Sequence, residues 1–270
     1  MKNILRVFFA LIMIINCTIL GYAEVITGNV EKTGAKKQNK IVDADTKKPI
    51  PFAIIKIPTK KYQTKSDKEG YFELNADITG ATIMSVEKDG YRPFSLTLNK
   101  DDFSKPLIVG IEKTQITDLG LEKGIVHIGD NNFSEKSANS SDFRLKSAGP
   151  YYSKTFKIDT VAHGENAYFV IGSVIGVDTL LSRQMGQSRV TTSYASPAQI
   201  YFNGQKLAEI KYNSDGQQVL LPKQLIKQNG ENEITIKAGK NLFQKSYIDY
   251  DDIELANMHI EFKPAVANDD

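Results

Sequence analysis

The sequence predicts an all-β protein made of two β-sandwiches in tandem. Short apolar runs bounded by Gly, Pro, Asn or Asp recur over residues 39–113 and again over residues 143–264. Strands of this length and spacing are typical of β-sandwiches. Between them, residues 134–141 hold four serines and no large apolar side chain, a composition typical of connecting segments. We therefore expect residues 114–142 to link the two domains.

The N-terminus has the pattern of a secretory signal peptide. An almost wholly apolar run over residues 4–20 follows a short basic region, and small residues precede an expected cleavage after Ala23. A retained membrane anchor is the alternative, but the run is short against the roughly 20 residues that a bilayer span needs. The Ile-Asn pair before Cys17 disfavours a lipoprotein. We expect residues 1–23 to be removed and the rest to be exported to the periplasm, cell surface or extracellular space, with no integral membrane segment.

The bulk composition excludes several classes of function. The chain has 34 Lys and Arg against 32 Asp and Glu, and the predicted signal removes two basic residues, so the mature chain is neutral. Nucleic-acid binding that is independent of sequence needs a basic surface, so we expect no nucleic-acid partner. The only cysteine, Cys17, leaves with the signal, which excludes disulfides and thiolate metal sites.

The first half of the mature chain divides into a polar arm and a strand-rich region. Residues 24–38 are Lys-rich, and we expect a solvated arm or a first edge strand there. Gly70 and Gly90 lie between apolar runs, where tight turns require a positive φ. The runs that predict strands cover residues 52–57, 71–74, 81–86, 94–98 and 107–111.

Three segments of this region are similar to the carboxypeptidase regulatory-like family. Residues 41–53 (IVDADTKKPIPFA) resemble its opening strands, residues 66–72 (SDKEGYF) its Thr/Ser-Asp-x-x-Gly-x-Phe turn, and residues 88–91 (KDGY) its Gly-Tyr element. The resemblance implies a seven-stranded, prealbumin-like Ig sandwich over residues 39–113. In that family the domain is typically an accessory or interaction domain without chemistry of its own.

The second region contains further strand and turn signals. Asn203-Gly204 predicts a hairpin, because Asn-Gly is the strongest short-range hairpin signal. Pro222, followed by Leu225 and closed by Gly230, predicts one short helical turn. Strands are predicted within residues 125–128, 156–158, 167–171, 200–207 and 233–237.

The last apolar run changes phase within itself. Its first two apolar residues alternate on one face, and the next three fall in the opposite phase. A one-residue slip moves side chains to the other face of a strand, so we predict a β-bulge near Ala256-Asn257. The bulge would keep five residues inward: Ile253, Leu255, Met258, Ile260 and Phe262.

An ordered set of motifs resembles the galactose-binding-like β-sandwich superfamily. Residues 200–207 are similar to its strand-Asn-Gly-strand unit, residues 220–236 to its helix–Gly-x-Asn-x-Ile-x-Ile unit, and residues 250–255 (YDDIEL) to its closing strand. The resemblance implies a jelly roll over residues 143–264, with a short tail at 265–270. Many members of that superfamily are carbohydrate-binding modules, and others bind proteins or lipids.

The sequence contains no catalytic signature. His127, His163 and His259 are single and widely spaced, and no metalloprotease, nucleophile-elbow or phosphate-loop motif occurs. We therefore predict that the protein is not an enzyme.

Asp249, Asp251 and Asp252 form the sharpest cluster of charge. Adjacent carboxylates repel unless a cation or hydrogen-bond donors compensate, and Ca²⁺ takes six to eight oxygen ligands. The resemblance adds that structural calcium is common in that superfamily and that an Asp before the last strand is a frequent ligand. We predict a structural Ca²⁺ site at these three residues. The alternative is a solvated acidic strand start paired with Lys240 or Lys245.

Two polar and aromatic segments, residues 182–196 and 239–247, are predicted to be long loops, which often carry function at the end of a sandwich. Sugar recognition combines a flat aromatic ring with fixed polar groups, and these loops supply both. The candidate ligand-binding residues are Arg183, Arg189, Tyr194, Asn241 and Tyr247.

We therefore expect the two loops to meet at one end of the second domain and to bind a carbohydrate or surface glycan there. The alternative is a structural or assembly protein that uses both sandwiches for contacts with a protein partner. That alternative predicts filled loop ends and an exposed apolar patch elsewhere.

Overall fold

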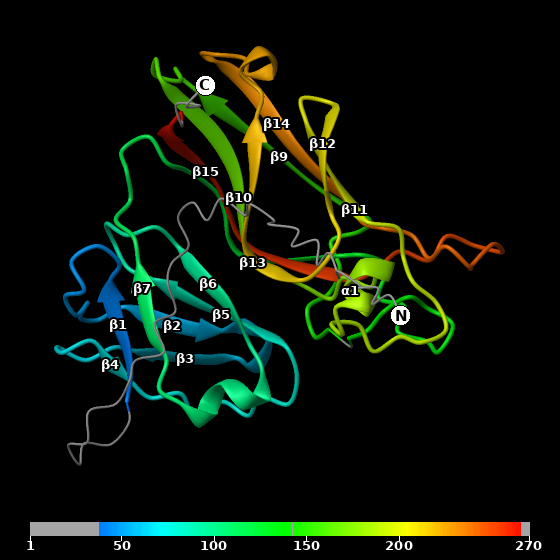
Figure 1. Cartoon of the computed structure of the whole chain (residues 1–270), viewed down its shortest axis with the longest axis horizontal. Coiled ribbons are helices and arrows are strands. Elements are labelled where there is room, and N and C mark those ends of the chain that lie inside the picture. Colours follow the sequence, from blue (N-terminus) through cyan, green and yellow to red (C-terminus); the bar gives the residue numbers. More distant parts are fainter. Residues whose placement is uncertain (1–37, 142, 266–270) are drawn as a thin grey trace, which may run out of the picture.

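The computed structural model describes residues 38–141 and 143–265 (Figure 1). The predicted signal peptide, the arm up to residue 37 and the last five residues lie outside the described residues, so the predictions made for them stay predictions. Four β-sheets form two sandwiches, which confirms the predicted all-β fold class.

The N-terminal sandwich has seven strands in two sheets. One sheet has the order β4-β1-β7 and the other β3-β2-β5-β6, with β1 parallel to β7. Each predicted strand is present, and the polar edge strand β3, which has no apolar run, is an addition. The bounds are β1 Asn39–Asp43, β2 Ile54–Ile57, β3 Tyr62–Lys65, β4 Tyr71–Phe72, β5 Thr82–Glu87, β6 Phe94–Leu98 and β7 Ile108–Ile111, with 3₁₀ turns at Pro58–Lys60 and Lys100–Ser104.

The turn before β4 shows why one predicted glycine is needed. Gly70 has a φ of +80°, and a Cβ atom there would lie 2.6 Å from the carbonyl oxygen of Ile41. The carboxylate of Asp67 accepts hydrogen bonds from the backbone N–H groups of Glu69 and Tyr71 at 2.9 and 2.8 Å. The backbone of residue 70 therefore lies so close to β1 that only glycine fits at this position.

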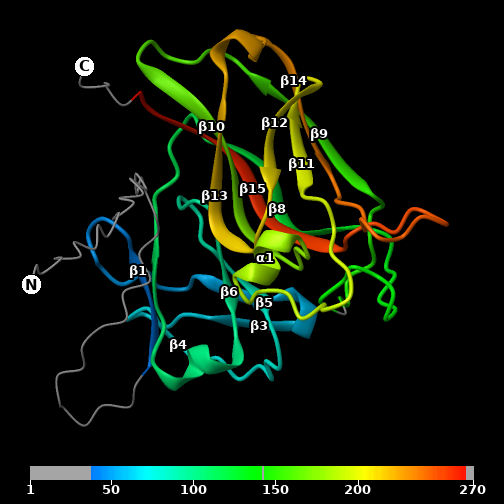
Figure 2. The same cartoon turned by 45° about the vertical axis from the view of Figure 1, so that its right-hand side comes forward.

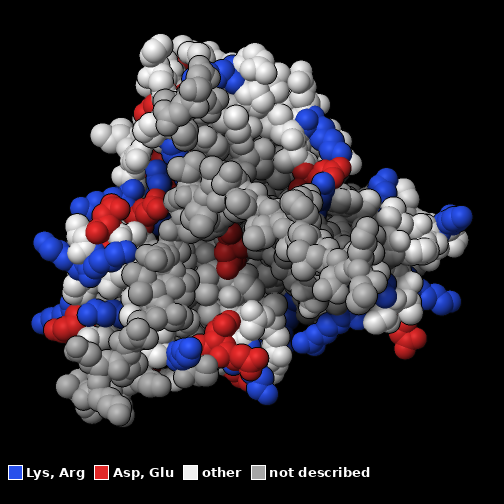
Figure 3. All heavy atoms as spheres, viewed as in Figure 1, with Lys and Arg blue, Asp and Glu red and all other residues white. Residues whose placement is uncertain are grey.

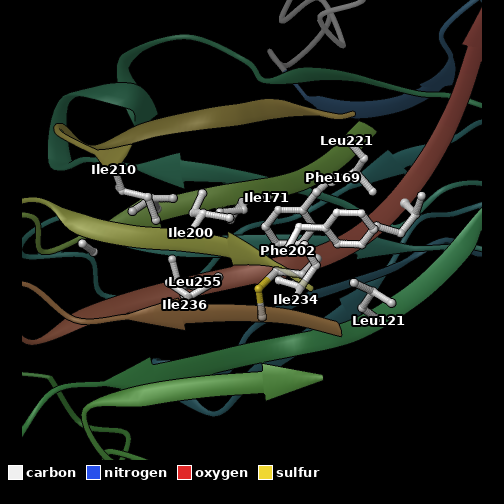
Figure 4. Close-up of a cluster of buried hydrophobic side chains, with 14 of the residues drawn as sticks. Leu121, Phe169, Ile171, Ile200, Phe202, Ile210, Leu221, Ile234, Ile236 and Leu255 are labelled. Atoms are coloured by element: carbon white, nitrogen blue, oxygen red, sulfur yellow. The ribbon is translucent and has the colours of Figure 1, made fainter. Parts of the chain in front are cut away.

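The C-terminal sandwich packs the sheet β13-β10-β15-β8 against the sheet β12-β11-β14-β9. Figure 4 shows the core between them, where Phe169 of β10 and Phe202 of β11 are fully buried. The bounds are β8 Leu119–Ile128, β9 Tyr151–Ile158, β10 Glu165–Ile175, α1 Leu180–Gln184, β11 Ala198–Phe202, β12 Gln205–Ile210, β13 Ser214–Leu221, β14 Gly230–Lys237 and β15 Ile253–Pro264.

Two local predictions in this sandwich are confirmed. Asn203 and Gly204 have φ values of 48° and 82° and join β11 to β12 as a tight hairpin. Pro222 precedes a 3₁₀ turn at Lys223–Leu225, the short helical turn that the sequence predicts.

Strand β8 begins the C-terminal sandwich earlier than we expected. It pairs antiparallel with β15, from Ile128 opposite Ile253 to Leu119 opposite Ile260. Glycines and a Glu-Lys pair interrupt its apolar pattern, so only residues 125–128 were predicted as a strand. The connection between the two sandwiches is therefore residues 112–118, and most of the expected linker belongs to the second sandwich.

The predicted bulge in β15 is confirmed. The pairing of β15 with β8 shifts register between Ala256 and Met258, and Asn257 has a φ of 51°. All five apolar residues of the two phases lie in the core as a result: Ile253, Leu255, Met258, Ile260 and Phe262.

The N-terminal sandwich packs on the outer face of the sheet that contains β15 (Figures 1 and 2). The Ser173 hydroxyl donates a hydrogen bond to that of Ser95 at 3.0 Å. Ile83 of β5 packs with Ile175 of β10 and Ala256 of β15 in a small buried cluster. Strand β15 is therefore buried on both faces, by its own core on one side and by the other sandwich on the other.

Arg92 joins the two sandwiches by charge. Its guanidinium lies 2.5 Å from Glu112 and 2.7 Å from Asp118, which follow β7, and 3.6 Å from Glu261 of β15. Hydrogen bonds from His259 and Lys263, together with the charge of Arg92, hold the pKa of Glu261 at about 2 although burial opposes this. The junction therefore combines a charged cluster around Arg92 with a small apolar cluster around Ile83.

The remaining surface is mixed in charge. Figure 3 shows basic and acidic side chains interspersed along the left-hand edge of the molecule, over the N-terminal sandwich. Within residues 38–141 and 143–265, no helix has the length and apolar character of a membrane span.

Candidate functional site

The two loops of the predicted ligand site do meet. The backbone N–H of Ser196 donates to the carbonyl oxygen of Lys240 at 2.8 Å, and that of Leu242 donates to the carbonyl oxygen of Tyr194 at 3.1 Å. The rings of Tyr194 and Phe243 pack edge to face with their centroids 4.9 Å apart. The last three residues of the 182–196 segment are thus joined to residues 239–247, and the two loops meet as expected.

The five predicted ligand-binding residues do not share one concavity. Asn241 is buried, and its side-chain amide donates to Asp249 Oδ2 at 2.9 Å while its carbonyl oxygen accepts from the backbone N–H of Phe243. Tyr247 is 51% exposed in the loop that Asn241 fixes, and Arg183 is exposed on α1. Only Arg189 of the five lines the large cavity that is described below.

The acidic cluster is buried, which makes the solvated alternative wrong. Asp249, Asp251 and Asp252 are 1%, 1% and 0% exposed. Asp249 accepts hydrogen bonds from Asn132 Nδ2 at 2.6 Å and from Ser137 Oγ at 2.9 Å, besides the bond from Asn241. The Ser- and Asn-rich stretch that we expected to be a linker is therefore fastened to the start of β15.

Asp252 is held in the same way from the other side of the strand. Its Oδ1 atom lies 2.7 Å from His127 Nε2 and accepts from the backbone N–H of Asn131 at 2.9 Å, and its Oδ2 accepts from Asn139 at 3.1 Å. Burial alone would lower the pKa of His127, but the bond to Asp252 raises it. This pair links β8, β15 and the 130–141 loop.

The third carboxylate, Asp251, pairs with a second buried acid. Its Oδ2 accepts from the backbone N–H of Asp178 at 3.1 Å. Burial raises the pKa of both carboxyls, that of Asp178 to about 7, where Ser188 and Ser140 only partly oppose the effect. Both buried carboxyls therefore favour the protonated form more than an exposed Asp does.

The three predicted calcium ligands thus face different partners. Asp249 and Asp252 already accept bonds from side-chain and backbone donors, and a Ca²⁺ ion would have to displace them. Among residues 38–141 and 143–265, no group of three or more His, Cys, Asp or Glu side chains is arranged to hold a metal ion. The calcium site stays a prediction that needs a direct test.

A cavity of about 800 Å³ lies at the junction of the two sandwiches. The N-terminal sandwich contributes mainly the 3₁₀ turn before β3 and the ends of β5 and β6, and the C-terminal sandwich contributes loops beside β10 and α1. Polar and charged side chains dominate the lining, with Phe143 as the one aromatic ring among the described lining residues. They include Lys60, Thr82, Asn99, Ser140, Arg144, Gln187, Arg189, Asn213, Asp215 and Glu254.

Glu254 is the most unusual residue of this cavity. It is 0% exposed, and neither carboxylate oxygen has a hydrogen-bond partner among the described residues. Its strand neighbours are His127 on β8, which is occupied by Asp252 and the carbonyl oxygen of Leu145, and Ile175 on β10. Burial raises the pKa of Glu254 to about 7, so the carboxyl is partly protonated near neutral pH.

Sequence reasoning missed Glu254, Arg144 and the cavity. Glu254 alternates with inward residues in β15, and in a lone sandwich that pattern predicts exposure to water. In the structure it is buried at the junction, beside the 140–144 loop and the N-terminal sandwich. Arg144 follows the expected linker, and no local pattern indicates that it faces the same cavity as Arg189.

The comparisons with known proteins give only slight likenesses. No protein-family model matches the chain, and no curated protein matches it. A glycosyl hydrolase family 2 member from Bacteroides cellulosilyticus DSM 14838 covers 53% of this chain with a TM-score of 0.28 and 11% identity. A proposed β-galactosidase from Bacteroides fragilis covers 67% of it with a TM-score of 0.25 and 14% identity. This chain spans only 21% and 23% of those two chains, and no activity follows from them.

The fold and the cavity together define the class: a two-domain all-β protein with a polar cavity where its sandwiches meet.

Proposed function

We propose that this chain is an exported, non-catalytic binding protein whose ligand is a carbohydrate or cell-surface glycan. In this proposal the first sandwich acts as a carboxypeptidase regulatory-like accessory domain, and the second acts as a galactose-binding-like jelly roll. The ligand lies in the junction cavity, where both sandwiches contact it.

The observation that supports this proposal is the lining of the cavity. Its volume of about 800 Å³ is within the range of ligand pockets, which occur preferentially at domain interfaces. Sugar hydroxyls need hydrogen-bonding groups in fixed positions. Arg189 and the side-chain N–H groups of Asn213 supply donors, and Gln187 holds the backbone of Asn213 at 2.9 and 3.0 Å. The oxygen of the Asn213 amide is held by the backbone N–H of Val177 at 2.8 Å, so this group is fixed before a ligand arrives.

A glycan-array screen of the mature chain, followed by titration calorimetry of each hit, tests the proposal. Arg189→Ala removes a cavity residue and is expected to abolish or weaken binding at least tenfold. Tyr247→Ala removes the exposed ring at the tip of the loop, outside the cavity, and should leave affinity unchanged. Loss of binding only in Tyr247→Ala would place the ligand at the loop end instead, and absence of any glycan ligand would reject the proposal.

One observation favours the structural alternative as a second candidate, although the apolar patch lies on the predicted loop and not elsewhere, as that alternative expected. The loop after β14 exposes four large apolar side chains to more than half of their full area: Leu242 by 53%, Phe243 by 56%, Tyr247 by 51% and Ile248 by 56%. Its base is rigid, because Asn241 and Asp249 are bonded through both backbone and side chain. Exposed apolar side chains that cluster on a rigid loop are typical of protein contacts.

Sedimentation velocity over a concentration series tests the second candidate. Self-association that disappears in Phe243→Ser would support assembly through this loop. Leu220→Ser is a matched control, since Leu220 is 49% exposed on β13, and it should leave the sedimentation unchanged. A monomer at every concentration would contradict self-assembly through the loop.

A further inference from the structure

Three cations line the junction cavity without a carboxylate partner. Lys60 comes from the N-terminal sandwich, and Arg144 and Arg189 come from loops of the C-terminal sandwich. None of the three forms an ion pair with any described residue, in contrast to Arg92, which has three acidic neighbours in the same junction. The cavity therefore presents positive charge from both of its walls.

Among the described lining residues, the two acidic ones do little to offset this charge. Asp215 is already bound, because its carboxylate accepts from the backbone N–H and the hydroxyl of Thr97 at 3.0 and 2.9 Å. Glu254 is fully buried between His127 and Ile175, and a partly protonated carboxyl contributes less than a full negative charge. Within the part of the chain that the structure describes, the uncompensated groups are thus the two guanidinium groups and the ammonium.

We infer that the junction cavity binds an acidic glycan, such as a uronic-acid-containing or sulfated saccharide, through Arg144 and Arg189 with Lys60 on the opposite wall. This inference rests on the proposed function and names its ligand class. A guanidinium matches the planar, two-oxygen geometry of a carboxylate and forms two parallel hydrogen bonds with it. The Gln187 amide is bonded to the backbone of Asn213 through both its nitrogen and its oxygen, at 2.9 and 3.0 Å, so the side-chain N–H groups of Asn213 are the neutral donors that remain for hydroxyl groups.

Glu254 adds a second, independent feature of the ligand. Its two oxygens lack partners among the described residues, and a buried polar group without a partner is costly. Both oxygens are buried, so a ligand hydroxyl or amide N–H would satisfy them only after a side chain of the cavity wall moves aside. The ligand therefore combines an acid group with hydrogen-bond donors, as acidic sugars do.

Titration calorimetry of the mature chain with matched oligosaccharides tests the inference. The probes are oligogalacturonate and its neutral methyl ester, so that charge alone differs. We expect the acid to bind and the ester to bind at least about tenfold more weakly, since a hydrogen bond to a charged group contributes roughly 1.5–3 kcal/mol. Affinity for the acid should also fall as salt is raised, because screening weakens exposed charge pairs.

Two variants and one control locate the charge. Arg144→Gln and Arg189→Gln should each weaken binding of the acid at least about tenfold while leaving the thermal unfolding curve unchanged, since both side chains are exposed. Lys146→Gln removes an exposed cation two residues from Arg144 that does not line the cavity, and should leave affinity unchanged.

The outcomes separate the inference from the proposed function. Binding of the acid with loss in both Arg variants supports both. Equal affinity for acid and ester, or binding of neutral glycans alone, overturns the inference and leaves the glycan-binding proposal standing. Binding of the acid that Lys146→Gln weakens as much as the Arg variants also overturns it, since the charge would then act from the general surface. No binding of any acidic or neutral saccharide rejects both.

Discussion

Replacement of Arg92 by Met should weaken the union of the two sandwiches more than any other single charge change in the described structure. The guanidinium is 9% exposed and faces Asp118 and Glu261, whose side chains are 6% and 7% exposed. Without the cation these carboxylates remain buried near one another with fewer partners. Breaking a buried pair in this way costs about 3–5 kcal/mol.

The pKa of Glu261 gives a second measure of the same interaction. Its shift from 4.5 to about 2 corresponds to roughly 3 kcal/mol in favour of the ionised form, and Arg92 supplies only part of it, after His259 and Lys263. We therefore expect Arg92→Met to lower the free energy of unfolding by about 3 kcal/mol at pH 7, or the melting temperature by roughly 6–12 °C.

Urea unfolding followed by far-UV circular dichroism measures this loss, because the chain has no Trp for fluorescence. Lys56→Met is the matched control. The Lys56–Glu87 pair has a similar distance of 2.8 Å, but its side chains are 34% and 29% exposed, so its removal should cost no more than about 1 kcal/mol.

The pH dependence has a definite sign. A carboxyl with a lowered pKa stabilises the fold above its unfolded pKa, and that contribution is lost as pH falls. The difference between wild type and Arg92→Met should therefore shrink between about pH 4.5 and pH 2. Equal losses in Arg92→Met and Lys56→Met at pH 7, or a difference that persists at pH 2, would refute this account of the junction.

Three further predictions concern buried acids and turns. Asp178→Asn should stabilise the protein by up to about 4 kcal/mol at pH 8 and hardly at pH 4. The reason is that a buried carboxyl whose pKa is raised to about 7 destabilises the fold as pH rises from about 4 to 7. Equal gains in melting temperature at both pH values would contradict this prediction. Gly70→Ala should cost roughly 1–3 kcal/mol more than Gly90→Ala in urea unfolding, since both have φ near +80° but only residue 70 has an atom within 4 Å of the added Cβ. If the predicted calcium site exists, EDTA should lower the melting temperature by a few degrees and added Ca²⁺ should restore it. An unchanged melting temperature would mean that Asp249 only accepts hydrogen bonds from its protein neighbours.

Local chemistry made much of the fold predictable from the sequence. The change of phase between Leu255 and Met258 predicted the bulge, because both sides of the slip are strongly apolar and only one arrangement buries them all. Asn203-Gly204 predicted its hairpin because the two-residue turn needs a positive φ at both positions. These signals depend only on neighbours in the chain.

The unpredicted parts depend on contacts between distant segments. Ser137 and Asn139 have the composition of a linker, and only their bonds to Asp249 and Asp252, more than a hundred residues later, make them part of the second sandwich. The apolar and polar residues of β8 alternate too weakly for the whole strand to be recognised from sequence. Its backbone pairs with β15 alone among the described strands, and that pairing joins segments more than 120 residues apart.

The candidate site was only partly predictable, because some of its features depend on local residue type and others on contacts between distant segments. The meeting of the two loops followed from their place at the ends of neighbouring strands, and Arg189 was selected from residue type. Asn241 was selected on the same ground, but its hydrogen bonds to Asp249 turn it inward. The cavity itself required knowledge of how one sandwich docks on the other, and Glu254 carries no mark of that docking in its own sequence.

The position of β15 at the end of the described chain has a consequence for the order of folding. Residues 39–113 contain all seven strands of the first sandwich, which can close while later residues are still being synthesised. The second sandwich cannot do so, because β8 and β10 are joined only through β15, which emerges more than 120 residues after β8. Until then β8 and the edge of β10 that faces away from β13 have no strand partner, and such edges are open to aggregation or to a chaperone. Strand β15 thus completes the core of the second sandwich and one wall of the junction together, and a chain that stops short of it would lack both.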